Sequence, residues 1–521
     1  MLFALVCLAS VVTPRRTSAQ VVPGSGSAIG SFAADRARLD QVTGDAPLLD
    51  STASPATGLR VVKPTVELFW NSQLPSAGND GAIWAGRGAN VSATAGLTAI
   101  WSHSGANVDM ALLPEATYSQ NLPFQILRGR SADRSAFSSP WHLGASSADL
   151  PLRFGDQAIR TVGLGQSALS LTLGGVAIGA SAANEWWGPA LRNTLVLSNN
   201  AAGIPRLFLR TARPLHTDLG WIDARLIIGG LTESPYFDHD PSNDARSASG
   251  VLLTFRPAAD SGLTLGLSRL VIAPVASNGA VLGHTFDVLT RWEPVQNPRD
   301  TVAGGKTPQR TDQIFSLFAR WVFPGSGVEA YGEWARTELP RSLREYLEAP
   351  QSTQAYTIGL QWARRVSRGH RLRLQTEFTY LEQTVIWPDR APMDYYTGRA
   401  TIQGFTQRGQ VLGAATGPGS SSQFLAGDWV TKAAQVGLFA SRLRSENDAL
   451  YRQVNPSPTQ HDVTYFVGLR GGARVPRFDV STELVASKRL NYLFQSQFSI
   501  QAPVIAIDMT NLSLRVSVHP I

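Results

Sequence analysis

Apolar and polar residues alternate strictly along much of this chain from Leu59 onward. The alternation is clear at 91–101, 169–173, 356–362, 372–380 and 463–469, and it is cleanest at 511–518, which reads NLSLRVSV. Successive side chains of a strand point to opposite faces of the sheet. Each stretch therefore predicts a β-strand with one apolar face and one polar face.

This pattern fits both a large soluble β-sandwich and a transmembrane β-barrel. The apolar faces often end in an aromatic residue, as at Trp101, Trp362 and Tyr380, which is typical of the girdles at a membrane interface. The polar faces carry charged residues at successive positions, such as Arg371 and Arg373, which suits a water-filled lumen. We therefore predict an all-β transmembrane antiparallel barrel.

The spacing of the pattern predicts the number of strands. A membrane-spanning strand takes about 9–11 residues, and roughly 25 residues per strand with its connection give about 18 strands over 59–521. We expect the long polar connections to be external loops: Gln120–Pro151, Phe237–Ser249, Gln296–Asp312 and Ser445–Gln460.

Composition agrees with a barrel and disfavours a helical membrane protein. The chain has 521 residues and a mean hydropathy of −0.06. It has no apolar run of about 18 residues beyond its N-terminus, as a spanning helix requires. The formal net charge of +7 fits either plain solubility or an attraction for polyanions.

The N-terminus predicts an export signal followed by a leader. Leu2–Val12 is an apolar core, and Thr17-Ser18-Ala19 suits cleavage, so we predict a signal peptide at 1–19. The only cysteine, Cys7, lies inside it, and the exported chain then has no thiol for disulfides, catalysis or metal binding. Residues 20–58 are predicted to be a flexible leader, with either a short helix at Ser31–Val42 or disorder throughout.

One segment stands apart from the alternating pattern. Ala183–Asn200 reads ANEWWGPALRNTLVLSNN, with two adjacent tryptophans before a Gly-Pro turn signal. A short apolar run, Leu195–Leu197, follows, and the polar residues Ser198–Asn200 end it. These residue types predict a strand–turn–strand unit that carries polar and aromatic side chains.

The same segment resembles a signature of the capsule assembly Wzi family of bacterial outer-membrane β-barrels. Further segments resemble the family in the same order along the chain: Trp84–Gly88 (WAGRG), Gly165–Gly175 (GQSALSLTLGG), Thr232–Phe237 (TESPYF) and Gly404–Gly419 (GFTQRGQVLGAATGPG). The leader departs from the family pattern, because it is too short for a full N-terminal helical bundle.

The resemblance implies a lectin-like protein of the bacterial outer membrane that binds and anchors capsular or extracellular polysaccharide at the cell surface. We expect that polymer, acidic sugars included, and outer-membrane lipids as partners of a monomer, with no nucleic acid, cofactor or metal. A porin-like diffusion channel is the alternative. An enzyme acting on lipid or glycan is less favoured, because the sequence has neither a G-x-S-x-G elbow nor an H-E-x-x-H motif.

Two groups of residues are candidates for polysaccharide binding. Indole faces stack on sugar rings, and amide and guanidinium groups bind hydroxyls or carboxylates. The first group is Trp186, Trp187, Arg192, Asn193, Asn199 and Asn200, and the second is Arg371 and Arg373. The alternatives are packing of the tryptophans inside the barrel, turn hydrogen bonds of the asparagines, and pairing of the arginines with lumen carboxylates such as Glu329, Glu333 and Glu377.

Overall fold

The structure is a computed structural model that describes residues 31–48, 57–76, 78–127, 131–295, 309–383, 393–453, 461–494, 496–499 and 502–520. The predicted signal peptide at 1–19 and the start of the predicted leader lie outside the described residues. Among the described helices, none is long and apolar enough to cross a membrane.

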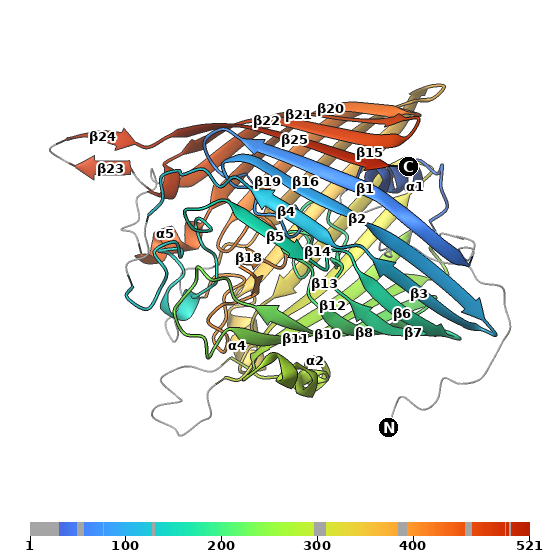
Figure 1. Ribbon diagram of the computed structural model, residues 1–521, viewed down its shortest axis with the longest axis horizontal. Coiled ribbons are helices and arrows are strands. Elements are labelled where there is room, and N and C mark those ends of the chain that lie inside the picture. Colours follow the sequence, from blue (N-terminus) through green and yellow to red (C-terminus); the bar gives the residue numbers. More distant parts are fainter. Residues whose placement is uncertain are drawn as a thin grey trace.

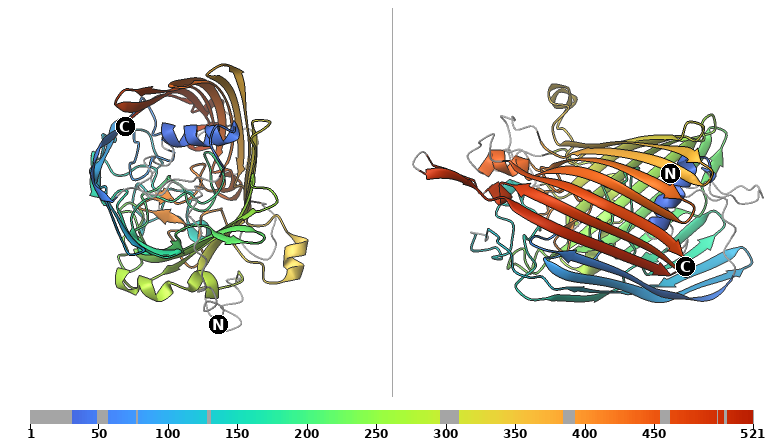
Figure 2. Two further views of the ribbon diagram at one scale, coloured as in Figure 1. Left: turned by 90° about the vertical axis from the view of Figure 1, so that its right-hand side faces the viewer. Right: turned by 90° about the horizontal axis from the view of Figure 1, so that it is seen from above.

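The strands close into one antiparallel barrel (Figures 1 and 2). Twenty-one strands join edge to edge. Three strand positions in the wall are each built from two short strands, so the wall has 18 strand positions. The first strand, β1 (Gly58–Asn71), pairs with the last, β25 (Met509–Pro520), with Leu68 opposite Val516. The predicted fold class and strand number are confirmed.

The other wall strands follow one another around the barrel in chain order. Their bounds are β2 (Gly88–His103), β3 (Ala106–Leu112), β4 (Glu115–Ser119), β5 (Ile159–Gly163), β6 (Ala168–Leu173), β7 (Val176–Ser181), β8 (Arg206–Thr211), β9 (Leu215–Thr217), β10 (Gly220–Thr232), β11 (Ala245–Pro257), β12 (Leu263–Pro274), β13 (Asp312–Phe323), β14 (Val328–Arg336), β15 (Gln354–Ser367), β16 (His370–Tyr380), β19 (Ser421–Thr431), β20 (Ala434–Ser445), β21 (Asp462–Val475) and β22 (Phe478–Leu490).

Proline and glycine residues account for the three strand positions that are divided into two short strands. Pro114 separates β3 from β4 and Pro214 separates β8 from β9, because proline has no N–H to donate to a ladder. Gly165 lies between β5 and β6 with φ +53°, and a Cβ there would come within 2.5 Å of the Leu113 carbonyl oxygen. Only glycine tolerates that approach in that conformation.

The alternating pattern sorts the side chains as predicted. On β25, Leu512 and Leu514 are 41% and 39% exposed on the outer face of the wall. On β16, Arg373 and Glu377 point inward and are buried. The outer face of the barrel is therefore an apolar surface suited to lipid, and the polar residues line the interior.

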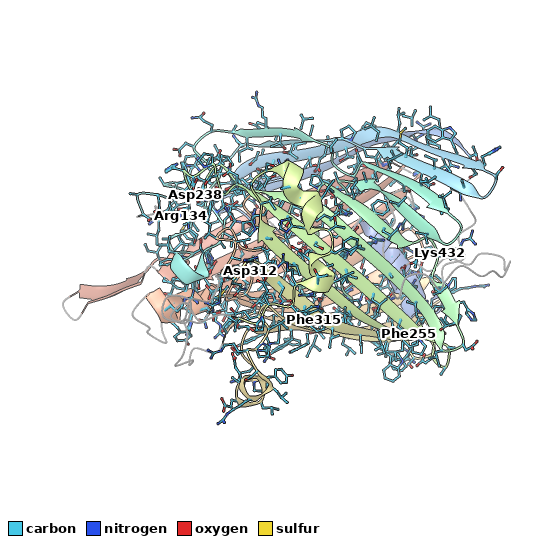
Figure 3. The ribbon with its side chains drawn as sticks, turned by 90° about the horizontal axis from the view of Figure 1, so that it is seen from below. Arg134, Asp238, Phe255, Asp312, Phe315 and Lys432 are labelled. Carbon is cyan, nitrogen blue, oxygen red and sulfur yellow. The ribbon has the colours of Figure 1, made fainter. Side chains whose placement is uncertain are left out.

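The two ends of the barrel differ in their connections. Turns of a few residues join strands at one end, and long connections fill the other, which is typical of the periplasmic and external sides of such barrels. In Figure 3, Lys432 lies in a short turn at one end, and Arg134 and Asp238 lie in long connections at the other.

The long connections carry the remaining short elements. These are η1 (Gly144–Ser146), η2 (Asn278–His284), α2 (Asp287–Thr290), α4 (Leu343–Glu348), β17 (Thr406–Gln407), β18 (Gln410–Val411), α5 (Asn447–Gln453), η3 (Tyr492–Phe494), β23 (Ser496–Ser499) and β24 (Ala502–Ala506). Of the loop predicted at Gln296–Asp312, residues 296–308 lie outside the described residues, and Asp312 begins β13.

Two predicted external loops need correction. The loop expected at Phe237–Ser249 ends earlier, because β11 begins at Ala245. The first residues of β11 read ARSASG, and small polar and small apolar residues there give no visible alternation. The loop expected at Ser445–Gln460 contains helix α5.

Helix α1 (Phe32–Val42) lies across the opening of the barrel at the short-turn end (Figure 2). Its N-cap residue, Ser31, accepts a hydrogen bond from the Ala34 N–H at 3.2 Å through its side chain. Leu39 and Val42 pack against the inner wall in one cluster with Val322, Ala363 and Val430. The wall thus supplies the packing that a short isolated helix lacks, and the predicted short helix is present.

The main apolar core lies inside the barrel. Its members come from the inner faces of strands β10 to β15 and from two connections, residues 187–204 and 381–414. Trp187, Leu195, Tyr395 and Phe405 are among its fully buried side chains. Loops from the long-connection end therefore fold back into the lumen and fill part of it.

Candidate functional site

The connection between β7 and β8, residues 182–205, is the segment that carries the sequence signature, and we call it the signature loop. The structure corrects the prediction of a strand–turn–strand unit here, because no strand occurs between Ser181 and Arg206. The loop instead runs irregularly through the lumen. Its backbone groups find partners on the barrel wall and on other loops.

Two wall carboxylates hold the signature loop. Glu377 on β16 accepts hydrogen bonds from three successive backbone N–H groups, those of Leu191, Arg192 and Asn193, at 2.7, 3.1 and 2.9 Å. It also accepts from the Tyr331 hydroxyl at 2.8 Å. Convergence of backbone N–H groups on one anion satisfies donors that have no strand partner.

The second carboxylate holds the next part of the loop. Glu333 on β14 accepts from the Leu195 N–H and the Thr194 hydroxyl, both at 3.1 Å, and from the Ser316 hydroxyl at 2.8 Å. Gly188 lies against the same carboxylate with φ +141°, and a Cβ there would come within 2.5 Å of it. A glycine is therefore required where the loop passes the wall.

Trp187 has a packing role. Its side chain is fully buried in the lumen core, and a Cβ on Gly250 would come within 2.7 Å of its ring. The indole N–H donates to Glu185 at 2.6 Å, and Glu185 pairs with Arg206 and Arg225, each at 2.6 Å. Burial raises the pKa of Glu185, but the two guanidinium groups outweigh it and bring that pKa down to about 2. The interior-packing alternative fits this residue.

Trp186 and three polar residues of the signature loop face a different environment. A cavity of about 1130 Å³ lies in the lumen beside the core, and its lining includes Trp186, Arg192, Asn193 and Asn199. The lining extends from residues near the short turns, such as Arg213, to residues of the long connections. Half-buried aromatic, amide and guanidinium groups of one loop thus line one cavity.

Arg192 is placed to offer a positive charge to this cavity. Its guanidinium lies 4.4 Å from the centre of the Phe424 ring and 5.9 Å from that of Phe439. Within the described residues, its side chain makes no hydrogen bond or ion pair. The aromatic rings fix the direction of the guanidinium without neutralising it.

A second such guanidinium was missed in the sequence. Arg210 on β8 lines the same cavity and lies 5.7 Å from the Phe208 ring centre, and it has no ion pair within the described part of the chain. The signal for it was the alternation in RLFLRT, where Arg206, Phe208 and Arg210 share the inward face of the strand. The sequence could not show that this face lies opposite the signature loop.

Asn199 and Asn200 hold other loops. The Asn199 side chain lines the cavity and donates to the Asn79 carbonyl oxygen at 3.0 Å. The Asn200 side chain donates to the Val411 carbonyl oxygen at 3.0 Å. Both amides therefore connect the signature loop to segments more than 100 residues away in sequence.

Arg371 and Arg373 lie beneath helix α1 and outside the lining of the cavity. Arg371 pairs with Asp40 and Asp45 at 2.6 and 3.1 Å. Arg373 is fully buried between Asp35 of α1 and Asp428 of β19, at 2.8 Å from each. The two arginines are paired, as the alternative interpretation has it, but with these carboxylates and not with Glu329, Glu333 or Glu377.

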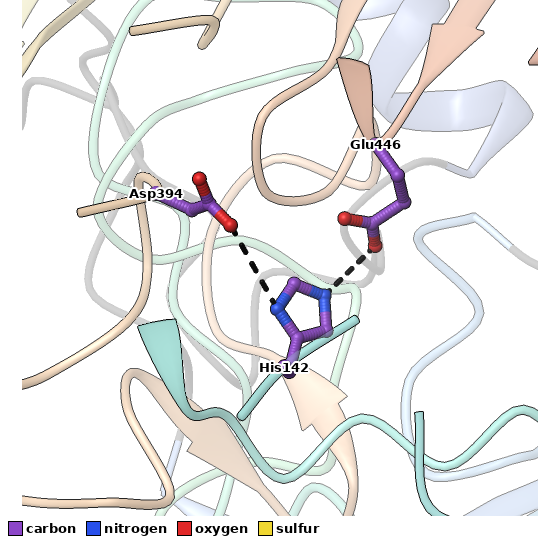
Figure 4. A group of neighbouring side chains, drawn as sticks. All are labelled: His142, Asp394 and Glu446. Carbon is purple, nitrogen blue, oxygen red and sulfur yellow. Dashed lines mark hydrogen bonds and ion pairs between the residues drawn. The ribbon is translucent and has the colours of Figure 1, made fainter. Parts of the chain in front are cut away.

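A histidine cluster joins three long connections (Figure 4). His142 Nε2 lies 2.9 Å from Glu446 Oε1, and its Nδ1 lies 4.0 Å from Asp394 Oδ2. Burial lowers the pKa of His142, but the Glu446 carboxylate outweighs it and raises the pKa above 6.5. Asp394 also pairs with Arg452. The cluster is therefore an ion-pair network in which the Arg452 guanidinium supplies a positive charge to the carboxylates.

Comparison with known proteins identifies the family. The model of the family described as capsule assembly protein Wzi matches residues 78–475. The chain belongs to this family. The match covers the signature loop, both wall carboxylates that hold it and most of the barrel, so this Wzi-family protein is a barrel of the bacterial outer membrane.

The solved structure of a Wzi protein shows the same fold, and a second solved structure is a weaker match. Wzi of Escherichia coli, an outer-membrane protein involved in group 1 capsule assembly and a carbohydrate-binding β-barrel, is 12% identical, with a TM-score of 0.52 over 93% of this chain and 86% of that one. OccAB2 of Acinetobacter baumannii is 8% identical, with a TM-score of 0.42 over 88% of this chain and 97% of that one. No curated protein sequence matches the chain.

Proposed function

We propose that this Wzi-family protein binds capsular or extracellular polysaccharide and anchors it at the cell surface, with a saccharide segment held in the lumen cavity. The observation that carries this proposal is that different residues of the signature loop have different environments. Trp187 and the loop backbone are used to hold the loop in the barrel, while Trp186, Arg192 and Asn193 are left facing the cavity.

The chemistry of these groups suits a sugar chain. An indole face packs on the C–H surface of a pyranose ring. The side-chain amides of Asn193 and Asn199 each donate one hydrogen bond within the protein, to Ser422 and to Asn79, and their remaining polar capacity can bind hydroxyls. Arg192 and Arg210 line the cavity and lack acidic partners among the described residues, so each is available to pair with a sugar carboxylate. The proposal therefore favours a polymer that contains acidic sugars. Arg371 and Arg373, which pair with α1, are proposed to position that helix.

The filled part of the lumen favours binding over diffusion. Residues of the signature loop and of 395–414 form an apolar core with the inner wall. A diffusion channel needs a wide aqueous path, and the close-packed core together with helix α1 narrows the path that the lumen leaves open. Conductance in a planar bilayer separates the two functions, because a binding protein of this kind passes little current.

The proposal is tested by titrating purified polysaccharide from the source organism onto the detergent-solubilised barrel. Trp186→Ala and Arg192→Gln are each expected to weaken binding by about 1–3 kcal/mol, the range of aromatic and arginine hot spots. Arg192→Gln is also expected to reduce the salt dependence of binding, because it removes one charge contact.

Matched variants control for the chemistry of each change. Trp101→Ala removes an indole from the outer face of the wall, and Arg477→Gln removes an exposed arginine from a short turn. Both controls are expected to bind polysaccharide as the parent does. Parent-like binding by Trp186→Ala and Arg192→Gln, with heat-modifiability intact, would contradict the proposed site.

A further inference from the structure

The connection after β12 folds down over the outside of the barrel wall. Its η2 and α2 lie outside the barrel in Figures 1 and 2. Val281 of η2 packs in one cluster with Ile228 on the outer face of β10. The Ser249 hydroxyl on β11 donates to the Thr285 carbonyl oxygen at 2.9 Å and accepts from the Val288 N–H at 3.2 Å. This segment is therefore docked on the wall by side-chain and backbone contacts.

The wall beneath this segment is polar on its outer face. Ser247, Ser249, Arg269 and Gln313 all point outward there, and each is less than 9% exposed. Arg269 donates to Gln313 Oε1 at 2.9 and 2.6 Å. Polar and charged side chains on the lipid face of a barrel are costly, so the covering segment shields them from the membrane.

The same arginine fastens the covering segment. The Arg269 guanidinium donates to the carbonyl oxygens of Val288 and Arg291, at the end of α2. It also lies 3.7 Å from the centre of the Trp292 ring. A cation that binds the last carbonyls of a helical turn stabilises it.

The outward face of the covering segment is apolar. Leu282, Phe286, Leu289 and Trp292 are 58%, 59%, 45% and 53% exposed, and they recur every three or four residues along η2, α2 and the residues just after α2. The Trp292 indole N–H already donates to the Leu289 carbonyl oxygen at 2.9 Å, so its polar atom needs no water. Val281 and Val288 are buried on the wall side, so the segment carries apolar side chains both toward the wall and away from it, with Arg291 as its main exposed charge.

This apolar face continues the surface of the barrel that faces lipid. Along the outer face of β11, Ser249 is followed by Val251 and then by Leu253, which is 40% exposed. Leu265 on β12 is 41% exposed on the same face. The covering segment thus replaces polar wall with apolar surface at the edge of an existing lipid contact.

We propose that residues 278–292 form a flange embedded in the outer leaflet, where Leu282, Phe286, Leu289 and Trp292 bind the acyl chains of outer-membrane lipids. The flange gives the barrel an added lateral lipid-binding surface over β10 to β12. Such amphipathic segments lie at the boundary between headgroups and acyl chains. The flange would therefore fix the depth of the barrel in the membrane independently of what the lumen binds.

The experiment uses single-cysteine labels. Cys7 is the only cysteine, so Cys7→Ser supplies a background without thiols. Leu289→Cys tests the flange, Leu253→Cys on the wall is the lipid-facing control, and Asp133→Cys in an external loop, whose side chain is 74% exposed, is the water-facing control. Each purified variant is labelled with an environment-sensitive fluorophore and reconstituted in phosphatidylcholine vesicles.

Quenching decides the outcome. The label at 289 is expected to be quenched by brominated acyl chains and protected from aqueous iodide, as the label at 253 is. Iodide quenching equal to that at 133 overturns the proposal. Self-quenching at 289 that disappears on dilution with unlabelled barrel also overturns it, because a second copy then covers the face. Phe286→Cys repeats the test if Leu289→Cys does not fold.

Discussion

Replacing Glu377 with alanine is expected to release the signature loop from the barrel wall. The carboxylate accepts from three successive backbone N–H groups and from the Tyr331 hydroxyl. Among the described residues, Glu377 is the one acceptor that the N–H groups of residues 191–193 contact. Alanine leaves them without an acceptor inside the barrel, whereas glutamine keeps one oxygen.

The size of the effect follows from the contacts. An unsatisfied buried donor costs about 1–3 kcal/mol, and several coupled donors on one anion do not add fully, so we expect Glu377→Ala to lower the free energy of opening the loop by about 3–5 kcal/mol. Glu377→Gln is expected to lose about half of that, because one acceptor remains. A loss of 3 kcal/mol corresponds to an increase in amide exchange of about 100-fold or more.

Hydrogen–deuterium exchange of peptides covering 188–197 measures this directly. Glu483→Ala is the control, because Glu483 lines the cavity on β22 but makes no hydrogen bond or ion pair in the described part of the chain. Unchanged exchange at 191–193 in Glu377→Ala, with the barrel still heat-modifiable, would refute the anchoring role. Equal acceleration by Glu483→Ala would refute its specificity.

Two further outcomes are expected. Arg373→Gln should loosen α1, because it leaves Asp35 without its buried partner, and breaking such a pair costs about 3–5 kcal/mol. We expect faster proteolysis within 31–48 while the barrel stays intact. Arg477→Gln is the control and should leave the proteolysis rate unchanged. The His142 network should be strongest in acid: its pKa is raised by folding, so its contribution is complete below pH 6.5 and is lost as the pH rises through the folded pKa. External-loop proteolysis should accordingly increase with pH in the parent, while His142→Gln should lose that pH dependence; an identical pH profile in both would contradict the role of His142.

The wall of the barrel could be predicted because its signal is local. Alternation along 511–518 or 463–469 reports which face each side chain takes, and this follows from strand geometry alone. Where small residues replace the alternation, as at the start of β11, the prediction placed the first residues of the strand in the preceding loop. The number of strand positions in the wall followed from dividing residues 59–521 by roughly 25 residues for each strand with its connection.

The candidate site was predicted only in part. The sequence singled out the signature loop and four residues that line the cavity, Trp186, Arg192, Asn193 and Asn199. It gave the loop strands that it does not have, because its N–H groups are satisfied by Glu333 and Glu377, which lie about 140 and 185 residues further along the chain. Such partners leave no periodic trace in the loop itself.

The sequence by itself therefore determined the barrel and the identity of the loop that carries the signature, and it left open whether residues 31–42 form a helix or are disordered. Tertiary structure alone decided which tryptophan packs and which faces the cavity, and which charges are free. Arg371 and Arg373 are neutralised by carboxylates of α1. Arg192 and Arg210 instead lie above aromatic rings and have no carboxylate partner among the described residues. The physical reason is that alternation is set by neighbours along a strand, while the pairing of a buried charge depends on which distant segments the closed barrel brings against it.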